Sequence, residues 1–98
     1  MSLADNNPRR RDRMFVMAEI LEVALDGALK THLMYKANLS FAQLNEYLKL
    51  MLDLQLLEMM GNNGKTVYKT TSKGALYLQR YTKIQDLMKK EPNPNLES

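Results

Sequence analysis

Apolar residues recur every three or four positions near the start of this chain, the spacing that places one hydrophobic stripe along a helix. Between residues 11 and 25 they fall at Met14, Met17, Ala18, Leu21, Ala24 and Leu25. Gly27 follows, and glycine often ends a helix because it adopts left-handed dihedral angles. We therefore predict a first helix over residues 11–25. Residues 1–8 show no periodicity and are expected to form a flexible lead.

A second, shorter helix is predicted over residues 31–37. It turns Leu33, Met34 and Ala37 inward. Asn38 suits the turn that follows, because asparagine tolerates the left-handed conformation found at many helix ends.

A third helix is predicted over residues 41–54, where Leu44, Leu48 and Met51 form the inward stripe. Ser40 and Gln43 have the spacing of a capping box, in which each side chain accepts a hydrogen bond from the backbone of the other residue. This pair marks the start of the helix.

Two short strands are predicted over residues 56–60 and 66–70. Between them lies the segment Gly61-Asn62-Asn63-Gly64-Lys65, whose glycines and asparagines supply the positive dihedral angles of a hairpin loop. Thr71 or Ser72 can then cap a last helix over residues 73–89, which the prolines at 92 and 94 prevent from continuing far.

This order of elements predicts a mainly α fold with a small β-hairpin, namely a winged helix-turn-helix plus a C-terminal helix. The 98 residues suffice for one domain with a modest core, which we place at residues 9–90, with a flexible tail over residues 91–98.

The last helix contains a possible dimer seam. Tyr77, Tyr81, Ile84 and Met88 are separated by four, three and four positions, as in a coiled coil. The same residues can instead pack against the first helix of their own chain. We expect a homodimer, because a small domain gains stability from a shared core.

Composition narrows the classes of function. Cysteine is absent, so disulfides and thiolate metal sites are excluded, and no apolar run approaches the roughly 20 residues of a membrane-spanning helix. No secretory pattern occurs at the N-terminus, so a cytoplasmic protein is expected. The net charge of +3 permits nucleic-acid binding without requiring it.

Enzyme chemistry finds little support, and we predict no catalytic residue, no cofactor and no metal site. His32 is the only histidine and has no nucleophile or carboxylate at a helical spacing. Glu19, Glu22 and Asp26 have the spacing of a solvated helix face. Gly61 and Gly64 flank a hairpin tip rather than the start of a helix, so they do not form a phosphate loop.

Binding to double-stranded DNA explains more of the polar residues than an enzyme function does. Asn45 and Gln43 can pair with adenine, and Lys49 can contact guanine or phosphate. Ser40 and Thr31 lie at predicted helix starts, where backbone amides also attract phosphate. The role of Glu46 is undecided, since phosphate repels a carboxylate whereas the amino group of cytosine can donate to it. The complete set of predicted DNA-binding residues is Arg9, Arg10, Arg11, Arg13, Thr31, Lys36, Ser40, Gln43, Asn45, Tyr47, Lys49, Asn62, Asn63 and Lys65.

These residues resemble a known family, the small archaeal winged-helix DNA-binding proteins related to the Sulfolobus chromatin-associated group. The likeness rests on the arginines at 9–11, on Thr31-His32-Leu33-Met34-Tyr35-Lys36-Ala37-Asn38-Leu39-Ser40, and on Tyr68-Lys69-Thr70-Thr71-Ser72-Lys73-Gly74. The resemblance implies an archaeal transcriptional regulator or chromatin-associated protein that dimerises through an antiparallel pair of C-terminal helices. The last helix is short here, which is a departure from the family.

Two alternatives stay open. The exposed face of the winged helix can dock a partner protein without binding DNA, which the modest net charge and Glu46 favour. An apolar space between the first and last helices can also accept a small effector, since eight methionines make an adaptable interior.

Overall fold

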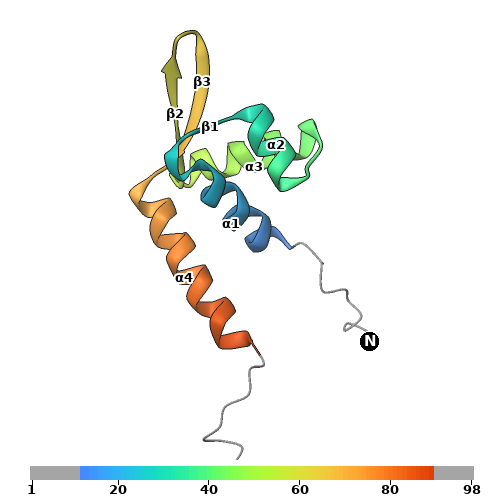
Figure 1. Cartoon of the computed structure of the whole chain (residues 1–98), viewed down its shortest axis with the longest axis vertical. Coiled ribbons are helices and arrows are strands. Elements are labelled where there is room, and N and C mark those ends of the chain that lie inside the picture. Colours follow the sequence, from blue (N-terminus) through green and yellow to red (C-terminus); the bar gives the residue numbers. More distant parts are fainter. Residues whose placement is uncertain (1–11, 90–98) are drawn as a thin grey trace, which may run out of the picture.

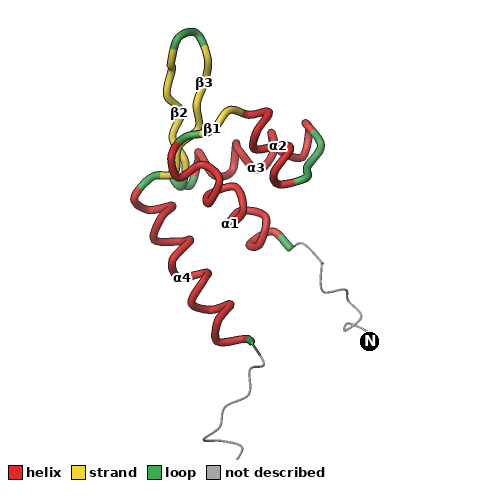
Figure 2. The backbone as a smooth tube through the Cα atoms, viewed as in Figure 1, coloured by secondary structure: helices red, strands yellow, loops and turns green. Residues whose placement is uncertain are grey.

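Four helices and a small three-stranded sheet form the part of the chain that the computed structural model describes, residues 12–89 without the side chain of Asn62. The elements in order are α1 (Arg13–Val23), a 3-10 turn (Ala24–Asp26), β1 (Ala28–Leu29), α2 (Lys30–Ala37), α3 (Phe41–Asp53), β2 (Leu57–Asn62), β3 (Lys65–Thr70) and α4 (Ser72–Met88). The predicted fold class is confirmed. The β2–β3 hairpin is the wing, and it lies at the opposite end of the molecule from α4 (Figures 1 and 2).

Helix α1 packs against α2 on one side and α4 on the other (Figure 1). The Asp12 side chain caps it by accepting a hydrogen bond from the backbone of Phe15 at 2.8 Å. The predicted stripe was partly wrong, because Met14 and Leu25 are 51% and 41% exposed while Val16 and Ile20 are buried. A helix that is covered from two sides buries a wider face than one stripe, and the 3-10 turn rotates Leu25 outward.

The turn between α2 and α3 follows the sequence prediction closely. Asn38 has a φ of 55°, and the Ser40–Gln43 capping box starts α3. Leu44, Leu48 and Met51 are buried, as predicted, and pack with Leu33 of α2 in the core. Local hydrogen bonding and periodicity are therefore sufficient to define this helix pair.

The sheet has the strand order β1-β3-β2 and is antiparallel throughout. Tyr68 of β3 lies between Ala28 of β1 and Met59 of β2 in the register. The sequence prediction missed β1, because two residues are too few to show an alternating pattern. Asn63 and Gly64 have φ angles of 54° and 79° in the hairpin turn, as the sequence predicted. The predicted loop was too long, because Gly61 and Asn62 belong to β2 and Lys65 belongs to β3.

The segment that joins the wing to α4 also fixes the end of α3. The Thr71 hydroxyl donates to the Gln55 carbonyl at 2.7 Å and accepts from the Gly74 amide at 3.0 Å. The Lys73 ammonium donates to the Leu54 carbonyl at 2.8 Å. These bonds attach the start of α4 to the carbonyl end of α3, so the two helices are held in one orientation.

Most of α4 extends away from the rest of the molecule (Figure 1). Gly74 is its one buried residue, and Tyr77, Leu78 and Tyr81 are half-buried against the core and α1. The last two turns, from Thr82 to Met88, are exposed.

Candidate nucleic-acid interface

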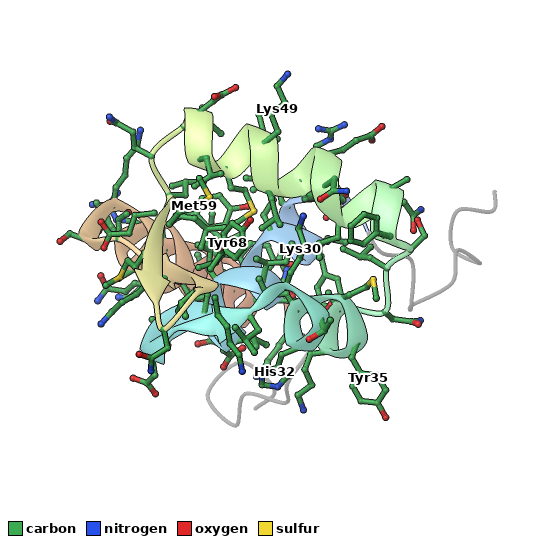
Figure 3. The ribbon with its side chains drawn as sticks, turned by 90° about the horizontal axis from the view of Figure 1, so that it is seen from above. Lys30, His32, Tyr35, Lys49, Met59 and Tyr68 are labelled. Atoms are coloured by element: carbon green, nitrogen blue, oxygen red, sulfur yellow. The ribbon has the colours of Figure 1, made fainter. Side chains whose placement is uncertain are left out.

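The outer side of α3 is exposed along its whole length. Opposite the buried stripe, Ala42, Glu46, Lys49 and Asp53 follow one another at helical spacing and are all exposed. Lys49 points away from the ribbon (Figure 3). This line is therefore accessible to a ligand, and it contains two carboxylates and one cation.

Ser40 and Gln43, both predicted to bind DNA, are partly occupied by the capping box. The Ser40 hydroxyl oxygen accepts from the Gln43 amide at 3.1 Å, and the Gln43 side-chain oxygen accepts from the Ser40 amide at 2.9 Å. The serine proton and the glutamine NH₂ group remain available as donors. A bidentate pairing of Gln43 with adenine requires its oxygen as well, which would then accept a second hydrogen bond beside that of the cap.

Arg13 and Tyr47 lie together at the α1 side of α3. The Arg13 guanidinium carbon is 5.8 Å from the centre of the Tyr47 ring, a cation–π contact. Gln43 and Tyr47 line a hollow of about 250 Å³ with Val16 and the turn residues Asn38 and Leu39. These predicted residues thus form one group, next to the N-terminal end of α1.

Asn45 and Lys49 lie on the other side of α3, one and two turns after Phe41. The Lys30 ammonium is 4.9 Å from the centre of the Phe41 ring. Lys30 is the first residue of α2, and it points upward between α2 and α3 when the molecule is viewed from the wing (Figure 3). Sequence reasoning missed Lys30. The available signal was a lysine and an aromatic residue at the starts of two consecutive helices.

A groove of about 360 Å³ separates the start of α2 from the wing. Its lining consists of Leu29, Lys30, Thr31, Lys65, Thr66 and Tyr68. The lining includes two lysines, two threonines and a tyrosine and no acidic residue, so the groove favours an anion. The fold thereby brings together two predicted residues, Thr31 and Lys65, that are far apart in the sequence.

Other predicted residues are less clearly grouped. Lys36 and Asn63 are exposed on α2 and at the wing tip. His32 and Tyr35 point away from α3 (Figure 3). Arg9, Arg10 and Arg11 and the side chain of Asn62 lie outside the described part of the chain.

The predicted dimer seam is divided by the structure. The Tyr77 and Tyr81 rings are parallel with centroids 6.4 Å apart, and the Tyr77 hydroxyl donates to the Met14 carbonyl at 3.1 Å. Burial raises the pKa of both tyrosines, with the nearby Asp12 carboxylate adding to it. Ile84 and Met88 are 49% and 72% exposed. Half of the predicted seam therefore packs within the chain, and the other half is open.

A groove of about 320 Å³ lies beside this seam. Its lining consists of Met14, Leu56, Lys73, Leu76, Tyr77, Arg80, Tyr81 and Ile84. Within residues 12–89 no cluster of three or more histidine or acidic side chains could hold a metal ion. No helix in the same range combines the length and apolar character needed to cross a bilayer.

The match to a family model decides the classification. Residues 10–89 fit the winged helix-turn-helix model, which covers all of the described residues 12–89. The chain belongs to the winged helix-turn-helix family. In the terms of this family, α2 and α3 form the helix-turn-helix and the β2–β3 hairpin is the wing.

Solved structures with the same winged helix-turn-helix fold come from archaea and bacteria. Sso10a-2, a DNA-binding protein from Sulfolobus solfataricus, is 20% identical with a TM-score of 0.65, covering 83% of this chain and all of its own. AF1382 from Archaeoglobus fulgidus is 12% identical with a TM-score of 0.64, covering 93% of this chain and all of its own.

A predicted DNA-binding transcriptional regulator from E. coli is 14% identical with a TM-score of 0.58, covering 86% of both chains. No curated protein is significantly similar to this sequence. At these identities the structural likeness establishes the winged helix-turn-helix fold. It extends the resemblance to the Sulfolobus proteins from sequence to backbone.

Proposed function

We propose that this winged helix-turn-helix protein binds double-stranded DNA as a homodimer and acts as a transcriptional regulator or a chromatin-associated protein. The observation that carries the proposal is the basic groove between α2 and the wing, whose lining includes Lys30, Lys65 and two threonines and no acidic residue. This groove lies on the Phe41 side of α3, and a helix in the major groove would bring it next to the backbone.

The proposed contacts follow from the chemistry of each surface. Lys30, Thr31 and Lys65 hold a backbone phosphate, since ammonium and hydroxyl groups donate to its oxygens. Asn45 and Lys49 extend from the same side of α3 to base edges in the major groove. Arg13 and the arginines at 9–11 follow the neighbouring backbone.

The remaining predicted residues complete this interface. Ser40 donates its free hydroxyl proton to a phosphate, and Gln43 and Tyr47 contact the backbone on the α1 side. Lys36 and the wing-tip residues Asn62 and Asn63 lie at its edges. Sso10a-2 and the E. coli protein are described as DNA-binding and as a predicted DNA-binding regulator, which supports the same use of the fold here.

Dimerisation is proposed through α4. Its last two turns expose Ile84, Leu87 and Met88, and 82% of the Leu87 surface is in contact with solvent. Pairing with a second copy would bury these side chains and the adjoining groove. A dimer places two α3 helices on DNA, so it favours half-sites separated by about one helical turn of roughly 10 base pairs or a multiple of it.

Two other functions have an observation in their favour. Glu46 and Asp53 on the outer line of α3 favour a protein partner. The apolar groove of about 320 Å³ between α1 and α4 favours a small effector. A rise in melting temperature on adding such an effector would support the latter.

Measuring duplex binding across a salt series distinguishes DNA binding from the docking of a protein partner. Counterion release predicts that log affinity falls with log salt by about 0.9 for each phosphate neutralised. Lys30→Ala and Lys65→Ala should each lower the magnitude of this slope by about 1. Lys83→Ala on α4, far from the groove, removes the same charge and should leave the slope unchanged. Absence of duplex binding even near ~50 mM salt would reject DNA in favour of a protein partner.

A further inference from the structure

Glu46 lies at the middle of the outer line of α3, where a helix in the major groove comes nearest to the bases. Its side chain is exposed, and it forms no ion pair with any lysine or arginine of residues 12–89. Lys49 lies one turn further along the same line and also forms no ion pair within that range. The carboxylate and the ammonium are therefore both available to a ligand.

A carboxylate at this position has few favourable partners on DNA. Phosphates repel it, and the acceptor atoms of guanine and thymine cannot donate a hydrogen bond to it. The donors in the major groove are the exocyclic amino groups of cytosine and adenine, but that of adenine stands beside the acceptor N7, which repels a carboxylate, so cytosine suits glutamate best. The guanine of the same base pair presents acceptors, which suit the ammonium of Lys49. The free Glu46 and Lys49 thus match the donor and acceptor pattern of one cytosine·guanine pair.

We propose that Glu46 is a specificity-determining residue that accepts a hydrogen bond from the amino group of a cytosine in the major groove. This inference rests on the proposed function. The carboxylate weakens binding to unrelated DNA by repulsion and makes tight binding depend on a donor at one base position.

Asp53 provides an internal comparison. It lies on the same exposed line and carries the same charge, but it is the last residue of α3, about 10 Å along the axis from Glu46 at 1.5 Å per residue. Asp53→Asn removes one negative charge from the line without changing the residue that faces the centre of the groove.

The experiment selects preferred sites from random-sequence duplexes with the wild type, Glu46→Gln and Asp53→Asn, and then measures the dissociation constant for each base at every enriched position. Circular dichroism and melting temperature verify that each variant is folded. We expect the wild type to prefer cytosine at one position of each half-site by about fivefold to a hundredfold, the usual range for a single mismatch. Glu46→Gln should lose this preference and bind unrelated duplexes more tightly, whereas Asp53→Asn should keep it.

Selection of the same cytosine by Glu46→Gln, at an unchanged ratio, would overturn the assignment. Duplex binding by the wild type without any preference for cytosine would overturn it too, while leaving the proposed function in place. A wild type that binds no duplex would reject the proposed function itself, and the inference with it.

Discussion

Gly74 illustrates how a single residue can be fixed by its surroundings. A methyl group at this position would overlap the Leu56 carbonyl oxygen and would lie 2.8 Å from the Thr70 methyl carbon and 3.0 Å from a Leu21 side-chain carbon. Thr70 is itself buried, and its hydroxyl donates to the Leu21 carbonyl at 2.7 Å. Gly74 and Thr70 belong to the segment after the wing that carried part of the family resemblance. Close packing therefore explains the residue types at these two positions.

Gly74→Ala should lower the free energy of unfolding by about 2 kcal/mol, the usual effect of an extra methyl group in a packed site. Backbone and side-chain atoms surround the position, so relief of the overlap requires α4 to move. Urea unfolding measured by circular dichroism gives the change.

Gly61→Ala is the matched control. A methyl group at Gly61 meets no atom within 4 Å, so its stability should change little. Equal losses for the two variants would show that glycine flexibility, rather than close packing, explains Gly74.

Some features of the helices depend on neighbouring residues, and others depend on contacts between residues that are distant in the sequence. The start of α3 is defined by its capping box, which involves residues three positions apart. The junction of α1 with α4 depends instead on a bond between residues distant in the sequence, from the Tyr77 hydroxyl to the Met14 carbonyl. Periodicity predicted α1 and α4, but it could not predict the hydrogen bond that joins them.

The α1–α4 junction should weaken in alkaline solution. Burial raises the pKa of Tyr77 above its ordinary value of 10.0, so the folded state holds this proton more tightly than the unfolded state. The stability that this difference contributes is present below the pKa of Tyr77 in the unfolded state. It is lost as the pH rises through the pKa of Tyr77 in the folded state. We expect the free energy of unfolding to fall as the pH rises past 10, and Tyr77→Phe to reduce that fall.

Urea unfolding across this pH range provides the measurement. Tyr35→Phe is the control, because it removes the same hydroxyl from a side chain that is 82% exposed on α2. A fall in Tyr77→Phe as steep as that of the wild type would contradict the expectation.

At the scale of the whole molecule, the two proposed surfaces are separated. The wing and the basic groove lie at one end, and the exposed half of α4 extends toward the other (Figure 1). The hydrogen bonds of Thr71 and Lys73 to the end of α3 connect them rigidly. A dimer formed by α4 would therefore set the spacing of the two recognition helices.

Ile84→Glu should dissociate the proposed dimer while leaving the monomer folded, because this side chain is already 49% exposed in the single chain. An unpaired carboxylate buried between two copies costs several kcal/mol, so the dimer dissociation constant should rise at least about tenfold. Sedimentation equilibrium measures it.

Gln79→Glu adds the same charge on another face of α4 and should leave the dimer intact. Dissociation by both variants would attribute the effect to charge alone. A wild type that is monomeric at high concentration would reject the α4 interface.

The sequence by itself determined the four helices, the hairpin and their order. Caps, turns and periodicities involve residues within about four positions of one another, so the Ser40–Gln43 box, the left-handed Asn38 and the stripe of α3 could all be predicted. Tertiary structure decided which surfaces these elements share. The two-residue strand β1, the wide buried face of α1 and the groove that joins Lys30 to Lys65 depend on how helices and strands pack across the molecule. Side chains that are distant in the sequence come into contact through that packing, and patterns within a few residues cannot predict such contacts.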